Sequence, residues 1–150
     1  MINAICYVFI SILLIRAVYT DVLWGRIENW VVGIGMAGGM TYLVMTKGST
    51  GMWNAGKHVF LFGLVLYVLY WIRGLGAGDV KLLVMAGMWM PQYSFPMAAG
   101  AFFIGAGIAC GRMLIRWIRR QKVYIRGETI PFAVPIACSF AGCLVLGGRV

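Results

Sequence analysis

The chain has 150 residues, of which 62% are hydrophobic and only 11% are charged. Because an average soluble domain has roughly 45–50% apolar and about 25% charged residues, this composition excludes a soluble monomer. The length predicts one domain, 1–150, and the mean hydropathy of +0.89 indicates more apolar surface than such a domain can bury. We therefore interpret the net charge of +9 as a sign of membrane topology before nucleic-acid binding.

Six apolar runs predict an all-α polytopic membrane protein with six transmembrane helices. These runs are 2–19, 30–46, 58–72, 80–90, 95–114 and 130–146. The first lacks a basic start and a cleavage site of small residues, so we expect a retained span and not a signal peptide. The connections are a polar stretch at 20–29, a loop at 47–57 rich in turn residues, and a break at Pro91 and Pro96.

The basic residues predict the orientation of these spans. Ten fall on one side of the six-span arrangement: Arg16, Arg26, Arg73, Lys81, Arg112, Arg116, Arg119, Arg120, Lys122 and Arg126. Three fall on the other: Lys47, Lys57 and Arg149. Because basic loops are retained in the cytoplasm, we expect the N-terminus outside. The four carboxylates are then all cytoplasmic: Asp21, Glu28, Asp79 and Glu128.

The fourth run, 80–90, is too short to cross a membrane as a helix. Its 11 residues cover roughly 16 Å of a hydrocarbon core about 30 Å thick. The preceding segment, 74–79, reads Gly-Leu-Gly-Ala-Gly-Asp, and glycine-rich backbone at membrane depth is tolerated where it lines protein or a wet cavity. We therefore predict a water-accessible pocket at the cytoplasmic face, with Asp79 in its wall.

Asp21 and Asp79 are the only aspartates, and the topology places both near one face of the membrane. Two neighbouring carboxylates share a proton, and such a pair can hydrolyse a peptide bond: one takes a proton from water while the other donates to the scissile carbonyl. Each also has a structural interpretation. Asp79 is a suitable N-cap for the helix that follows it, and Asp21 can be a solvated acid flanking the first span.

Other hydrolytic chemistries lack their sequence patterns. There is no His-Glu-x-x-His, and the single histidine, His58, falls on the outer side. No serine lies in a Gly-x-Ser-x-Gly turn. The cysteines lack Cys-x-x-Cys spacing and fall within apolar runs, so we infer no disulfide, no metal and no cofactor. They are Cys6, Cys110, Cys138 and Cys143.

Three segments carry a resemblance to a known family. The segment 76–83, Gly-Ala-Gly-Asp-Val-Lys-Leu-Leu, resembles the Gly-x-Gly-Asp signature of the type IV prepilin peptidases, which are intramembrane aspartic proteases. Asp21 with Arg26, Ile27 and Asn29 resembles the second catalytic segment of that family, and 130–135 resembles the proline-containing start of its last helix. Glu28 stands where the family usually has proline.

The resemblance implies a hydrolase that removes prepilin leaders at the cytoplasmic membrane face of a bacterium or archaeon. Asp21 and Asp79 are carried over as the catalytic pair, and Gly76, Gly78, Lys81 and Asn29 as motif or substrate-proximal residues. Longer members add an N-terminal domain with paired Cys-x-x-Cys motifs and an N-methylation activity. This sequence begins at its first span and is similar to the short, protease-only members that process tight-adherence pilins.

An alternative from another class is a non-enzymatic transport or assembly subunit whose buried acids relay protons or bind a cation. A protease needs Asp21 and Asp79 at one water, whereas a relay spreads them along a path. The basic residues after the fifth span recur at helical spacing beside Trp117. This pattern predicts a helix lying along anionic lipid headgroups, which together with the prepilin are the partners we expect.

Overall fold

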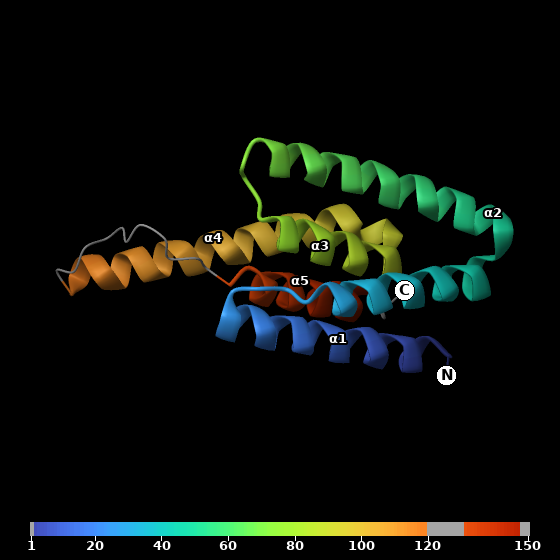
Figure 1. Ribbon diagram of the computed structural model, residues 1–150, viewed down its shortest axis with the longest axis horizontal. Helices are drawn as coiled ribbons and strands as arrows, with labels where there is room; N and C mark the ends of the chain where they lie inside the picture. The colour runs from blue at the N-terminus through green and yellow to red at the C-terminus, as the bar shows by residue number, and fades with distance from the viewer. Residues whose placement is uncertain (1, 120–130, 148–150) are drawn as a thin grey trace.

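The computed structural model describes residues 2–119 and 131–147, which form helices and short connections without a strand. The helices are α1 (Ile2–Trp24), α2 (Asn29–Trp71), α3 (Ala77–Trp89), the 3₁₀ turn η1 (Pro91–Tyr93), α4 (Ser94–Ile118) and α5 (Ala133–Gly147), shown in Figure 1. The predicted all-α class is confirmed. The predictions on Arg120, Lys122, Arg126, Glu128, Ile130 and Arg149 fall outside the described residues.

The long helix α2 is broken at Gly48, where the backbone adopts φ 63° and ψ −170°. Its two halves run in opposite directions from this break (Figure 1). The predicted loop at 47–57 is therefore wrong. A single glycine at positive φ, a conformation that costs glycine little, provides the turn, and the chain is helical again from residue 49.

Each of the six apolar runs lies on a separate helical segment, with Gly48 dividing the second from the third. Three stretches of the described chain are long and apolar enough to cross a membrane: Ile5–Trp24, Thr50–Trp71 and Pro91–Ile118. Six crossings and their orientation stay predictions. The fourth segment is short as expected, because α3 has 13 residues, about 20 Å of helix.

Helix α3 lies in the middle of the bundle, between the second half of α2 and α4 and α5 (Figure 1). Its side chains Leu82, Leu83, Met85 and Ala86 are fully buried. The indole Nε1 of Trp89 donates to the carbonyl oxygen of Gly35 at 2.9 Å, which fixes the far end of α3 against α2. Large apolar side chains elsewhere on the helices face outward, as expected for a surface that contacts lipid.

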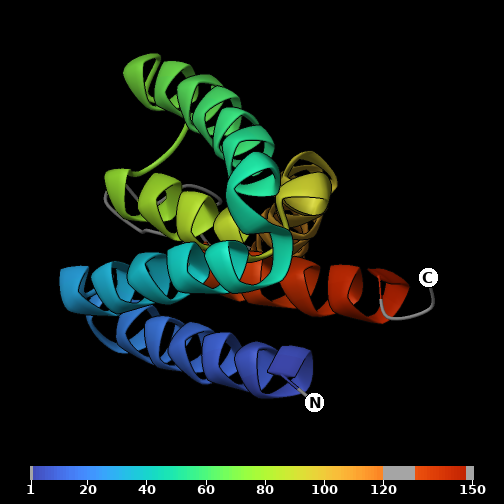
Figure 2. The ribbon, with the colours of Figure 1, turned by 90° about the vertical axis from the view of Figure 1, so that its right-hand side faces the viewer.

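Viewed from the end, α1 pairs with the first half of α2, while the second half of α2 rises away from them (Figure 2). Helix α4 extends past the bundle at the end where α1 turns into α2 and α2 into α3 (Figure 1). Its fully buried residues end at Gly105. The rest of α4, including Trp117 at 70% exposure, projects from the helical core.

Candidate active site

Asp21 lies in the last turn of α1. The first span was predicted to end at residue 19, but the helix continues to Trp24, because its end is set by Gly25 at φ 61°. The Gly25 N–H donates to the Asp21 carbonyl at 2.8 Å, which is the left-handed glycine cap of a helix C-terminus. The Asp21 carboxylate Oδ2 accepts from the N–H of Ala133 at 3.1 Å and so ties α1 to the start of α5.

Asp79 is the third residue of α3, and the N-cap is Gly76. The N-cap interpretation of Asp79 is therefore wrong by three positions. The carboxylate instead reaches back to the Gly76 backbone N–H, which donates a hydrogen bond to it. This is half of a capping box, and it holds the carboxylate in a defined place at the beginning of α3.

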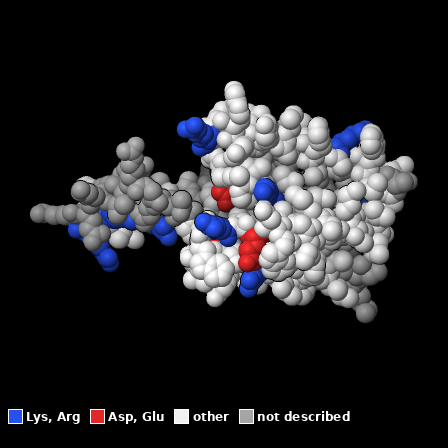
Figure 3. Space-filling view, viewed as in Figure 1, with Lys and Arg blue, Asp and Glu red and all other residues white. Residues whose placement is uncertain are grey.

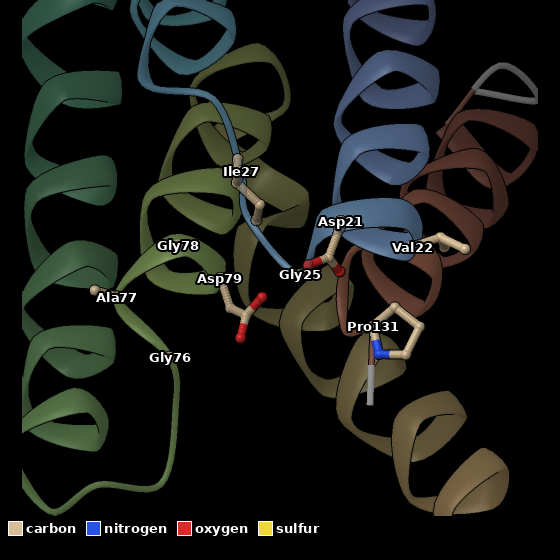
Figure 4. Close-up of a pocket in the computed structure, with 9 residues that line it drawn as sticks. All are labelled: Asp21, Val22, Gly25, Ile27, Gly76, Ala77, Gly78, Asp79 and Pro131. Atoms are coloured by element: carbon tan, nitrogen blue, oxygen red, sulfur yellow. The ribbon is translucent and has the colours of Figure 1, made fainter. Parts of the chain in front are cut away.

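Both aspartates line one pocket of about 490 Å³. Figure 4 shows their carboxylates pointing into the same space, Asp79 from α3 and Asp21 from the end of α1. Three connections complete the wall: the one after α1, the glycine segment before α3, and the residues just before α5. The other lining residues are Val22, Gly25, Ile27, Gly76, Ala77, Gly78 and Pro131. The sequence prediction of a pocket with Asp79 in its wall is met.

Asp79 lies outside the three candidate spans. The pocket raises the pKa of its carboxyl group from the ordinary value of 3.8 to about 6. Burial is the largest cause, and the negative charge of Asp21 raises the pKa further. The hydrogen bond from Gly76 lowers it, by stabilising the ionised form. Asp79 therefore holds a proton at a pH where an ordinary aspartate is ionised.

Residues 8–110, which include both aspartates, match the type IV leader peptidase family. The chain belongs to this family. Searches with this chain found no match among the curated proteins or the solved structures. Membership supports proteolysis as the activity of this leader peptidase, and its apolar helices support a location in a membrane.

Two glycines of the leader peptidase motif make room for different neighbours. A Cβ added to Gly76 would lie 2.8 Å from Oδ2 of Asp79, and one added to Gly78 would lie 3.3 Å from Cδ1 of Ile27. Gly76 therefore allows the carboxylate to fold back over the helix start. Gly78 allows the connection after α1 to pack against α3.

Lys81 and Asn29 contact each other and not the pocket. The Lys81 Nζ donates to Oδ1 of Asn29 at 3.1 Å, which joins α3 to the first residue of α2. Glu28, at the position where proline was expected, forms an ion pair with Arg16 at 3.3 Å. The connection 25–28 forms one wall of the pocket. It is held by the ion pair of Glu28 with Arg16 on α1 and, at the next residue, by the hydrogen bond of Asn29 with Lys81 on α3.

The sequence reasoning did not single out Val22, Gly25 or Ala77, which also line the pocket. Gly25 could have been found, because glycine directly after an apolar run is the usual signal of a helix C-terminus. Val22 and Ala77 carry no comparable signal. Within residues 2–119 and 131–147, no three His, Cys, Asp or Glu side chains gather as a set of metal ligands.

Proposed function

We propose that this leader peptidase is an intramembrane aspartic endopeptidase that removes the leaders of type IV or tight-adherence prepilins at the cytoplasmic membrane face. The observation that carries the proposal is that Asp21 and Asp79, 58 residues apart in the sequence, line one pocket. The family match supports leader cleavage. The transport or assembly alternative gains no such support, because a relay does not need both acids at one site.

The proposed mechanism divides the two roles between the aspartates. Asp79, whose raised pKa favours its protonated form, donates to the scissile carbonyl oxygen, while the Asp21 carboxylate takes a proton from a water molecule. The water oxygen then bonds to the carbonyl carbon. The carbon–nitrogen bond breaks, the proton held by Asp21 passes to the leaving amine, and the proton on the former carbonyl oxygen returns to Asp79 as the new carboxyl group forms. Ala133 orients Asp21 through its N–H, and Gly76 orients Asp79.

The same proposal places the pocket at the cytoplasmic side of a bacterial or archaeal membrane, with six crossings and the N-terminus outside. The distribution of charge supports this orientation. Figure 3 shows Asp and Glu gathered with Lys and Arg near the pocket end of the bundle, and further basic residues on the projecting part of α4. Basic residues near a span favour retention in the cytoplasm.

We further propose that the projecting part of α4 lies on the anionic inner leaflet. It carries Arg112 and Arg116, followed by Arg119 at its C-cap, among exposed apolar side chains that include Trp117 and Ile118. Each basic residue near such a surface contributes about 1 kcal/mol. The acids of the pocket, and not this helix, are suited to attract a basic prepilin leader.

The test is cleavage of co-expressed prepilins, read as the new N-terminus by mass spectrometry. Wild type should release a mature pilin that begins at its hydrophobic helix, and Asp21→Asn and Asp79→Asn should release none. Glu28→Gln is the matched control, because it removes a carboxylate that does not line the pocket. The glutamine oxygen can still accept a hydrogen bond from Arg16, so cleavage should be retained. Membrane insertion of every variant is confirmed by fractionation. Failure of wild type on a panel of type IV and tight-adherence prepilins would favour the transport or assembly reading.

A further inference from the structure

A second, larger cavity lies at the end of the bundle opposite the aspartates. It has a volume of about 650 Å³ and lies between the first turns after the Gly48 break and the α3–α4 connection, where Pro91, Gln92 and Phe95 close one side. A smaller cavity of about 310 Å³ adjoins it, since both are lined by Asn54, His58 and Leu61.

The polar side chains of these cavities are basic or neutral. Lys47 lines the larger cavity and Lys57 the smaller, while His58 and Asn54 line both. The described carboxylates, Asp21, Glu28 and Asp79, belong to the opposite end of the helices. The face in Figure 3 accordingly shows no Asp or Glu at this end. The cavities therefore offer hydrogen-bond donors and positive charge to an anion, and none of the described carboxylates lies beside them.

Gly51 leaves room for the side chain of Lys47. A Cβ added to Gly51 would lie 2.5 Å from the Cβ of Lys47, and the next two carbons of the lysine are within 3.7 Å of the same point. The aliphatic part of Lys47 therefore packs over Gly51. The Nζ of Lys57 lies 5.4 Å from the centre of the Trp53 ring, which is a cation–π contact.

Part of the lining of the larger cavity is apolar. Leu61 is 52% exposed and Phe95 is 43% exposed, and both line the cavity beside Ala55 and Pro91. Basic and apolar side chains that line adjoining cavities match a molecule with a charged head and a hydrocarbon chain. A free anion would use the basic side chains alone.

We propose that this surface binds an anionic phospholipid, with its phosphate between Lys47, Lys57 and His58 and an acyl chain along Leu61 and Phe95. The shared chemistry is a phosphate oxyanion, which a free phosphate also carries. The site is separate from the aspartate pocket, so the proposal does not depend on the peptidase mechanism.

The experiment uses the purified full-length protein in nonionic detergent with a photo-crosslinkable phosphatidylglycerol. Phosphatidylcholine with the same chains is the zwitterionic comparison, and peptide mapping locates the label. Phosphatidylglycerol should label peptides containing residues 47–61 and 91–95. The combined Lys47→Gln, Lys57→Gln variant should lose at least tenfold of this labelling, since each basic residue near an anionic lipid surface is worth about fivefold in binding.

The controls separate charge, fold and ligand source. Lys47→Arg with Lys57→Arg keeps the charge and should keep the labelling, as should Arg112→Gln with Arg119→Gln at the other end. Circular dichroism confirms that each variant is folded. Equal labelling by the two lipids, or undiminished labelling of the Lys→Gln variant, would overturn the proposal. Displacement of the label by millimolar inorganic phosphate would also overturn it, by assigning a free-anion site.

Discussion

Replacing Gly76 by alanine should separate catalysis from folding in this leader peptidase. The backbone of Gly76 has φ −72° and ψ 148°, which alanine adopts without strain. The new Cβ, however, would lie 2.8 Å from Oδ2 of Asp79. The carboxylate must therefore move by about 0.6 Å to reach an ordinary contact distance of 3.4 Å, and this movement weakens its hydrogen bond to the Gly76 N–H.

The two consequences differ in size. Alanine is a poorer N-cap than glycine, which costs roughly 0.5–1 kcal/mol of stability, or about 1–4 °C of Tm in a protein of this length. A misplacement of about 1 Å in a catalytic group costs about 10²-fold in rate, so kcat/KM should fall by about 10- to 100-fold. The loss of activity thus exceeds what the loss of folded protein explains.

Gly78→Ala is the matched control in the same helical turn. Its Cβ would meet the tip of Ile27 at 3.3 Å, and a flexible side chain can shift for about 0.5–1.5 kcal/mol, so kcat/KM should fall by clearly less than in Gly76→Ala. Both variants are compared with wild type by cleavage of a prepilin peptide in nanodiscs, with Tm measured on the same samples. Wild-type kcat/KM in Gly76→Ala, or equal losses in both variants, would refute the reasoning.

Three further predictions concern stability. Lys81→Met and Asn29→Leu should each lower Tm. Because both changes remove the same hydrogen bond, the double variant should be no less stable than the less stable single variant. Additive losses of Tm would contradict this. Because the folded-state pKa of Asp79 is raised from 3.8 to about 6, its protonated form favours folding at low pH, and this contribution is lost as pH rises through 6. This difference in pKa between the folded and unfolded states corresponds to about 3 kcal/mol of folding free energy. Solvent screening of the half-buried carboxyl group reduces that contribution to about 1 kcal/mol. The Tm of wild type should therefore fall relative to Asp79→Asn between pH 4 and 7, and a parallel pH dependence would be inconsistent with the shift. Arg73 has φ 59° at the end of α2, where glycine is preferred, so Arg73→Gly should raise stability by about 1 kcal/mol; an unchanged or lower Tm would oppose this.

The sequence was most informative where a local pattern decides the structure. The short run after Asp79 and the glycines before it predicted a short helix and a pocket, because helix length and glycine flexibility are local properties. The 47–57 loop was predicted wrongly for a related reason. Turn-forming residues mark where a helix can break, but one glycine at positive φ was sufficient.

Contacts between distant segments were not predictable in the same way. The hydrogen bond from Ala133 to Asp21 spans 112 residues and that from Lys81 to Asn29 spans 52. Each depends on how helices pack, which hydropathy does not specify. The resemblance named Lys81 and Asn29 without indicating that they contact each other.

The most direct test of the central claim is whether Asp21 and Asp79 act as one unit. Cleavage by purified Asp21→Asn, Asp79→Asn and the double variant would be measured in nanodiscs under single-turnover conditions. If the two carboxylates share one reaction, each single variant should lose as much activity as the double variant. Substantial cleavage by either single variant, or losses that multiply in the double variant, would contradict the account.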